Sequence, residues 1–184
     1  MKTILVTSLF LLLSFACFGQ NIKALDDEYG FRDAKLEMPP DSFNNLVLQE
    51  SVDELFPNAK LYKLNNIDLH IGGYDLDDIA DWFYKGELLT IEITVSKGFS
   101  NQQGVLKVLE AEYGKNVHKI NIDGANTYIW KGKKVEMTYV MGDSRNTPGD
   151  IQITSRKIKR QEISDEIMIE EKNEQETIGT SQQF

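Results

Sequence analysis

The chain has 184 residues, with 29 acidic and 20 basic side chains, a formal net charge of −9, and one cysteine. This acidic balance disfavours nucleic acid and anionic lipid as partners, because both repel a negative protein at long range. We expect partners among proteins, cations and neutral ligands, with a protein first and no nucleic acid. The sequence leaves the oligomeric state open.

Residues 1–20 have the pattern of a secretory signal peptide. Lys2 gives a positive start, Leu5–Phe18 is almost wholly apolar, and Gly19 and Gln20 form a small, polar exit. The apolar stretch is shorter than the roughly 20 residues that a bilayer span needs. We therefore expect cleavage after residue 19 or 20, no stable membrane insertion afterwards, and a periplasmic or extracellular location. An uncut N-terminal anchor is the alternative.

Cys17 offers a second way of holding the chain at a membrane. Ser14–Cys17 loosely resembles a bacterial lipobox, although the usual leucine three places before the cysteine is absent. One acyl chain would tether the protein only weakly. If the leader is instead cut after residue 20, 164 residues with a net charge of −10 remain. These residues contain no cysteine, which excludes disulfides, thiol nucleophiles and thiolate metal sites.

The rest of the chain divides into three segments by composition. Residues 21–30 are polar and acidic and predict a flexible leader, whereas 31–160 carry the apolar patterns of a single domain. Glutamates dominate from residue 161 onward, so 161–184 predict an acidic, largely disordered tail. Ile163 and Ile167 could share one face of a short helix there, and a recruitment peptide is the functional alternative to a solvated tail.

Prolines and aspartates punctuate the first part of the domain. A first strand over Phe31–Met38 is stopped by Pro39–Pro40. A short helix is expected next, capped by Asp41 or Ser42 and carrying Phe43, Leu46 and Val47. A short turn is expected over 51–56. Strand signals then follow over Ala59–Leu64 and Ile67–Tyr74, over a strand pair in Trp82–Val95, over a second pair in Thr127–Val140, and over Asp150–Ile158.

One longer helix is predicted between the two strand pairs. Ser100 would cap it, Gln103 would complete a capping box, and Gly114 would supply the left-handed stop. The apolar spacing then predicts a buried stripe of Val105, Leu106, Val108, Leu109 and Tyr113.

The two strand pairs contain an internal repeat. Residues 82–91 resemble residues 128–137, at an offset of 46, and each copy has an aromatic residue, Lys and Gly before an alternating apolar run. A Gly-X loop fits a type II′ turn, so we expect turns at Gly86-Glu87 and Gly132-Lys133 with both glycines at positive φ. The predicted cross-strand pairs are Tyr84 with Leu89, Trp82 with Ile91, Trp130 with Val135, and Tyr128 with Met137.

This register predicts one dry and one wet face for the sheet. The dry face would carry Trp82, Tyr84, Leu89, Ile91 and Ile93 in the first copy, and Tyr128, Trp130, Val135, Met137 and Tyr139 in the second. The wet face would carry Thr90, Glu92, Thr94, Glu136 and Thr138. Core filling is the simpler interpretation of the aromatics, and exposed binding anchors are the alternative.

Together these signals predict an α+β fold, in which an antiparallel sheet is built from two helix-plus-hairpin repeats, about 31–98 and 99–158, with helices on one face. The helix-then-hairpin repeat resembles the duplicated α-β-β units of β-lactamase-inhibitor-type proteins and of small outer-membrane assembly lipoproteins. The chain is also similar to uncharacterised secreted proteins of Bacteroidota, because its signal peptide ends in Gly-Gln. The resemblance implies binding or scaffolding and no catalysis.

No residue of the chain is predicted to be catalytic, cofactor-binding or metal-binding. His70 and His118 lie on separate predicted strands without metal-ligand spacing, and Gly72-Gly73 signals only a bulge or bend. Asp75, Asp77, Asp78 and Asp81 form the one carboxylate group. They leave two interpretations open, a calcium site and a solvated acidic turn, because an EF-hand's central glycine and distal glutamate are absent.

The functional expectation is therefore an exported, non-catalytic binding or adaptor module whose partner contacts the wet sheet face or the hairpin tips. The alternative is an extracytoplasmic hydrolase whose site is assembled from dispersed residues. A deep pocket with convergent carboxylates or His70 would favour the hydrolase.

Overall fold

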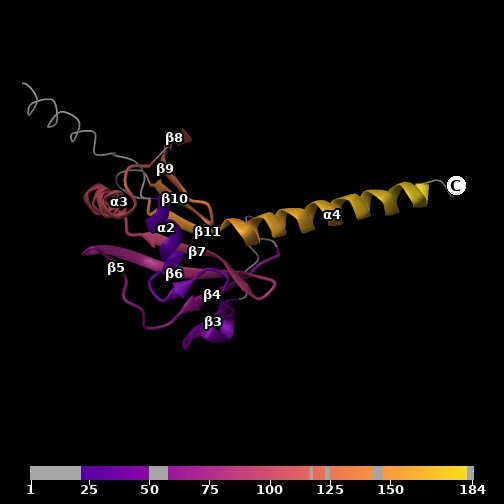
Figure 1. Ribbon diagram of the computed structural model, residues 1–184, viewed down its shortest axis with the longest axis horizontal. Coiled ribbons are helices and arrows are strands. Elements are labelled where there is room, and N and C mark those ends of the chain that lie inside the picture. The colour runs from indigo at the N-terminus through magenta and orange to yellow at the C-terminus, as the bar shows by residue number, and fades with distance from the viewer. Residues whose placement is uncertain (1–21, 50–57, 117, 123–124, 143–146, 182–184) are drawn as a thin grey trace, which may run out of the picture.

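The computed structural model describes residues 22–49, 58–116, 118–122, 125–142 and 147–181. The predicted signal peptide, Cys17 and the turn expected over 51–56 lie outside these residues. The chain has the predicted α+β fold, with a large antiparallel sheet and helices packed against it (Figure 1). The helices are α2 (Ile22–Glu28), the 3₁₀ turn η1 (Pro40–Ser42), α3 (Phe99–Tyr113) and α4 (Arg156–Ser181).

The main sheet has the strand order β3-β4-β6-β7-β11-β10-β9-β8, β5 pairs with β6 beside this path, and every pair is antiparallel. The strands β1 (Gly30–Phe31) and β2 (Ala34–Lys35) form a separate small hairpin. The bounds of the other strands are β3 Leu46–Gln49, β4 Lys60–Leu64, β5 His70–Ile71, β6 Tyr74–Tyr84, β7 Glu87–Val95, β8 His118–Ile122, β9 Ala125–Lys131, β10 Val135–Met141 and β11 Gly149–Ser155.

The first strand and the first helix predicted for the domain both differ from the elements that form. The strand expected over Phe31–Met38 is interrupted, since Arg32 takes a positive φ of 54° in the tight turn between β1 and β2. The short helix expected after Pro39–Pro40 is limited to η1, and β3 forms over Leu46–Gln49 instead. Pairing of β3 with β4 satisfies backbone groups that one isolated helical turn would leave open.

Helix α3 matches its prediction except at its start and at Val108. Gly98, with a φ of 111°, occupies the N-cap position, and Ser100 is exposed. Gly114 ends the helix at a φ of 76°, as expected. Four members of the predicted stripe, Val105, Leu106, Leu109 and Tyr113, are buried, whereas Val108 is half-buried.

The first hairpin, β6–β7, turns one residue earlier than predicted. Its last pair is Tyr84 with Glu87, and the loop is Lys85-Gly86, with φ values of 51° and 84°. Positive φ at both positions is the type I′ geometry, so the predicted type II′ turn at Gly86-Glu87 is wrong. Gly86 does take the positive φ that was expected.

A β-bulge on β7 then separates side chains of this hairpin that were predicted to share one face of the sheet. Phe83 pairs with Leu88 but Trp82 pairs with Thr90, so Leu89 is an extra residue on β7. A one-residue slip moves every following side chain to the opposite face. Trp82, Tyr84 and Leu89 therefore do not share the face of Ile91 and Ile93, contrary to the prediction.

The second hairpin, β9–β10, also departs from the predicted register, but by two residues. Trp130 pairs with Met137 and Tyr128 with Tyr139, across a loop that begins at Gly132. A shift of two preserves the face of each side chain, so the predicted dry face is correct here: Tyr128, Trp130, Val135, Met137 and Tyr139 are all buried together.

Gly132 is not at positive φ, so the predicted reason for this glycine is wrong. A Cβ atom added there would lie 2.3 Å from Asp26 Oδ1. The Asp26 carboxylate accepts hydrogen bonds from the backbone N–H groups of Lys133, Lys134 and Val135, at 2.8, 2.8 and 3.1 Å. Burial acts to raise the pKa of Asp26, but these donors overcome it and hold the pKa below its usual value.

The segment expected to be a flexible leader is thus helical in α2 and contributes to the fold. Leu25 is buried in the main core with Leu36 and Tyr113, and Asp26 holds the turn of the second hairpin. Both residues lie inside the range 21–30, for which the polar and acidic composition predicts a flexible leader. A short polar helix can be held by tertiary contacts that its sequence does not reveal.

The main core lies between the sheet and α2 and α3, and a smaller second core lies on the opposite face. Trp82, Tyr84 and Leu89 pack there against Ile158 of α4. Thr90 is fully buried on that side and shares a hydrogen bond with Thr154, so the predicted wet face is dry around the first hairpin.

Residues from 161 onward, predicted to be largely disordered, continue α4 as far as Ser181. Ser155 caps the helix, since its Oγ accepts from the N–H of Ile158 at 3.3 Å. Asp165 then accepts from Tyr84 Oη at 2.6 Å and from Lys85 Nζ at 2.7 Å. Beyond this point α4 projects away from the body (Figure 1). None of the helices described here has the length and apolar character needed to cross a membrane.

Candidate functional site

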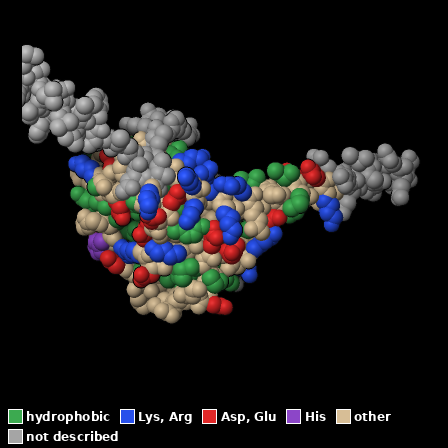
Figure 2. Space-filling model, in the orientation of Figure 1, with side chains coloured by type: hydrophobic (Ala, Val, Ile, Leu, Met, Phe, Trp, Pro, Cys, Tyr) green, Lys and Arg blue, Asp and Glu red, His purple; other side chains and the backbone are tan. Residues whose placement is uncertain are grey.

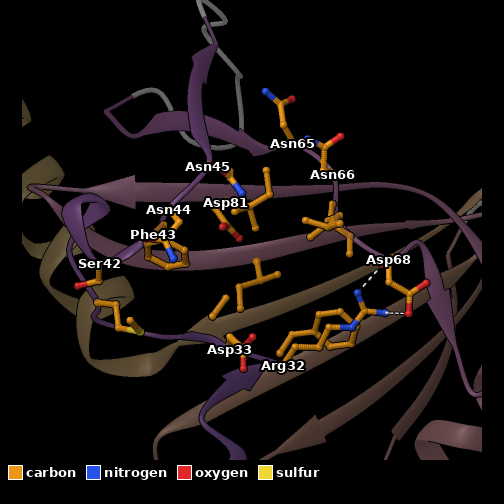
Figure 3. A pocket seen from close by; sticks show the side chains of 17 residues that line it. Arg32, Asp33, Ser42, Phe43, Asn44, Asn45, Asn65, Asn66, Asp68 and Asp81 are labelled. Carbon is orange, nitrogen blue, oxygen red and sulfur yellow. Dashed lines mark hydrogen bonds and ion pairs between the residues drawn. The ribbon is translucent and has the colours of Figure 1, made fainter.

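A pocket of about 420 Å³ opens on the main-core side of the first hairpin, between segments that are distant in sequence (Figure 3). Its walls come from the β1–β2 turn, from residues 42–45 after η1, and from residues 64–68 between β4 and β5. The floor is the sheet itself, where Ile79, Asp81 and Ile91 line the pocket. The volume is within the range of about 300–1,000 Å³ typical of small-molecule sites.

The rim of this pocket is polar and its interior is apolar. Four exposed amide side chains, Asn44, Asn45, Asn65 and Asn66, line it at the surface. Half-buried Phe43 forms part of the wall and packs edge-to-face on Phe83, with ring centroids 5.7 Å apart. An apolar pocket with a few polar groups is the usual arrangement for binding a small amphipathic molecule.

Asp81 is the feature that distinguishes the pocket from a packing defect. Its side chain points from β6 into the cavity (Figure 3), and the residue is only 1% exposed. Within the described part of the chain, neither carboxylate oxygen has a hydrogen-bond partner. Burial raises the pKa of Asp81 to about 7, because desolvation penalises its charged form. Buried polar groups in folded proteins are nearly always paired, so a ligand donor is a direct way of completing this site.

The opposite end of the pocket is braced by Arg32. Its guanidinium donates to the backbone carbonyls of Asp68 and His70 and lies 3.5 Å from the Asp68 carboxylate. Asp68 also forms a hydrogen bond with His70, with 2.7 Å between Asp68 Oδ1 and His70 Nδ1. This hydrogen bond is the main cause that lowers the pKa of Asp68. Arg32 thereby holds the loop before β5 against the β1–β2 turn.

The four aspartates considered as a calcium site do not converge. They lie along β6 rather than in a turn, and each has different surroundings. Asp75 lies 3.4 Å from His70, Asp77 accepts from Ser96, Asp78 pairs with Lys63, and Asp81 is buried in the pocket. In the part of the chain whose structure is described, no three His, Cys, Asp or Glu side chains are grouped so as to hold a metal ion.

Neither histidine lines the pocket within the described residues. His70 is exposed on β5 and bridges Asp68 and Asp75, so it braces the rim of the pocket without lining it. His118 lies on β8, and its side chain is outside the described residues.

The sequence predicted Asp81 to lie in an acidic turn, so its burial at the pocket was not expected. A signal was available, since Asp81 is a single acid between Ile79-Ala80 and Trp82-Phe83-Tyr84. An acidic side chain inside such an apolar run is rarely buried without a partner. The loops that form the pocket walls around Asp81, however, are distant in sequence, and only the folding of the chain brings them together.

Comparisons of the chain with protein-family models, with curated proteins and with solved structures find no match. The resemblance to duplicated α-β-β units therefore stays a prediction, and the pocket has to be interpreted from its own chemistry.

Proposed function

We propose that this protein is an exported, non-catalytic binding module, and that the Asp81 pocket takes a small amphipathic ligand with a cationic or hydrogen-bond-donating group. The observation that carries the proposal is the buried, unpartnered carboxyl of Asp81 in a pocket of about 420 Å³. An ammonium group would favour the ionised carboxylate and supply the missing donors. The phenyl walls and amide rim would hold the rest of the ligand.

Export rests on the signal-peptide pattern of residues 1–20. Binding without catalysis is favoured because the carboxylates of the pocket are dispersed. Figure 3 places Asp68 beside Arg32, at a distance from Asp81, and Asp33 on the β1–β2 turn. Paired carboxylates that work together as acid and base, or as acid and nucleophile, must flank one bond.

The raised pKa of Asp81 also supports the alternative, an extracytoplasmic hydrolase. A carboxyl that titrates near neutral pH is suited to general acid–base work. The two functions differ in what happens to the bound molecule. A small molecule captured from envelope extract and incubated with fresh protein should be recovered with unchanged mass if the protein is a binder, and as fragments if it is a hydrolase.

The binding proposal is tested by calorimetric titration with two probes of matched shape, 2-phenylethylammonium and the neutral 2-phenylethanol. We expect the ammonium probe to bind more tightly above pH 7 than below pH 6, because Asp81 is ionised only in the higher range. The alcohol should show little pH dependence. Asp81→Asn should abolish the preference for the cation.

A matched control is Asp150→Asn. Burial, with a smaller contribution from the nearby charge of Glu92, raises the pKa of Asp150 to about 7 as well, yet Asp150 lies outside the pocket. Equal binding of both probes at every pH, or equal effects of the two Asp→Asn substitutions, would contradict the proposal.

A further inference from the structure

A second surface of the molecule, distinct from the Asp81 pocket, lies along α4. Its first five residues include four basic side chains, Arg156, Lys157, Lys159 and Arg160, whereas five acidic side chains follow between Glu162 and Glu171. A helix with opposite charges at its two ends is complementary to a second copy of itself running in the opposite direction.

The residues of this helix also have coiled-coil spacing. Arg160, Ile163, Ile167 and Glu170 follow one another at intervals of three, four and three, which places them along one stripe of the helix. Ile163 is 44% exposed and Ile167 is 50% exposed, and Arg160 and Glu170 are exposed as well. The side chains of this stripe, which we call the α4 seam, are therefore available for packing.

We propose that the α4 seam is a homodimer interface in which two α4 helices pack antiparallel about a two-fold axis at residue 165. In this register Ile163 of each copy faces Ile167 of the other, and Arg160 of each copy faces Glu170 of the other. A parallel pair would instead oppose Arg160 to Arg160 and Glu170 to Glu170, which like-charge repulsion disfavours.

The body of the molecule provides a place for the second helix. A groove of about 450 Å³ runs beside the seam, between the first turns of α4 and the outer face of the strands β9, β10 and β11. Its basic lining residues are Lys131, Arg156, Lys159 and Arg160. Lys131 pairs with Glu136 at 2.8 Å and Lys159 with Glu162 at 2.5 Å, and Arg156 donates to the Gly132 carbonyl, so exposed Arg160 is the cation that a partner would meet first. Figure 2 shows Lys and Arg side chains gathered where α4 leaves the body, and apolar side chains on the projecting part.

The acidic half of a partner helix fits this basic groove. Glu170 and Glu171 of the second copy would approach Arg160 and Lys131, while the partner's body would lie at the far end of this copy's helix. The later turns of α4 project away from the body, which leaves that part of the helix open to a partner (Figure 1). Two isoleucines per copy make a small apolar centre, so we expect micromolar rather than nanomolar association.

The test uses the chain from residue 21, in analytical ultracentrifugation over a range of concentrations. Arg160→Glu and Glu170→Arg each place like charges together at both symmetric contacts. Each variant alone should dimerise on the order of tenfold more weakly than the unaltered chain. An equal mixture of the two variants should recover dimers, because both contacts then join opposite charges. The double variant should recover them as well.

Lys172→Glu is the control, since it makes the same charge change as Arg160→Glu on a part of α4 that lines a different pocket. It should leave dimerisation unchanged. Circular dichroism verifies that every variant retains its helix. An unaltered chain that stays monomeric at hundreds of micromolar would overturn the proposal. So would a folded mixture that fails to recover dimers, and a loss caused equally by Lys172→Glu.

Discussion

The two hairpins of the sheet start from similar sequences and end in different environments. The second, β9–β10, pairs regularly and buries its aromatics on one face, in the main core. The first, β6–β7, contains a bulge at Leu89 and buries side chains on both faces. In the first hairpin the extra residue places Leu89 on the face opposite to Ile91, where it packs with Trp82 and Tyr84 in the second core under α4.

The same comparison explains the pocket. Asp81 lies on the main-core face, paired across the strand with Ile91 and Tyr62. Thr127, which lies 46 residues further along the chain in the second hairpin, carries no ionisable group, and it alternates with Tyr128 and so faces away from the main core. The hairpin that contains the bulge is thus the one that carries a buried carboxyl at a cavity.

The largest expected effect comes from the two tryptophans. Trp130→Ala should reduce the free energy of unfolding by roughly 3–5 kcal/mol, the usual cost of truncating a buried large aromatic. Trp130 is 1% exposed, and its Nε1 donates to the Gly114 carbonyl at 2.7 Å. Chemical denaturation measures this loss.

Trp82→Ala should be comparably costly but should act in a different place. Trp82 packs with Ile158, so its removal should speed hydrogen exchange at the start of α4 under conditions in which the main core stays protected. Trp130→Ala should not do so. Identical exchange patterns in the two variants would mean that the second core is not a separate unit.

The next effect concerns pH and the buried carboxyl of the first hairpin. Because the pKa of Asp81 rises from 3.8 to about 7 on folding, the native state holds this proton more tightly than the unfolded chain does. The contribution of Asp81 to stability therefore falls as pH rises from about 4 to about 7, and then levels off. Asp81→Asn should remove roughly 2–4 kcal/mol of this fall, as measured by denaturation at several pH values.

Asp150→Asn should remove a separate part of the fall in stability with rising pH, since the pKa of Asp150 is raised to about 7 as well. Combined, the two substitutions should act additively because the sites share no partner. If the stability of the Asp81→Asn variant depended on pH as strongly as that of the unaltered protein, the Asp81 carboxyl would have to be hydrated in solution.

The smallest effects distinguish the two turns. Gly86→Val should cost about 1–3 kcal/mol because a β-branched residue is strained at a φ of 84°. No atom lies within 4 Å of the added Cβ, so the cost comes from the backbone alone. Gly132→Ala should also destabilise, but through its clash with Asp26.

A double-mutant cycle separates these causes. In an Asp26→Ala background, Gly132→Ala should lose most of its cost, whereas Gly86→Val should keep its full cost. Denaturant midpoints for the six proteins give the coupling energies. Additive behaviour of Asp26 and Gly132 would contradict the proposed contact.

The sequence was informative wherever periodicity alone determines structure. Alternation located β6–β7 and β9–β10, and the stripe from Val105 to Tyr113 together with Gly114 located α3. It failed where a single residue alters the register, as at Leu89, because neighbouring residues give no sign of an inserted position. It also failed at both ends of the domain, where acidic composition suggested disorder.

Those ends are ordered by distant contacts. Asp26 reaches residues 133–135, and Asp165 reaches Tyr84 and Lys85. The Asp81 pocket was not predictable for the same reason, since its walls meet only after residues 31–34, 42–45 and 64–68 have been brought together. Local composition cannot report contacts of this kind.

The most direct test of the account is a carbon-13 NMR titration of the Asp81 side-chain carboxyl, with and without 2-phenylethylammonium. We expect the free protein to show a pKa near 7, in line with its burial, and the cationic probe to lower that pKa. The Asp150 carboxyl should titrate at an unchanged pKa in the same spectra. An Asp81 pKa near 4 in the free protein, or a pKa that does not respond to saturating probe, would contradict the claim that this pocket binds a ligand through Asp81.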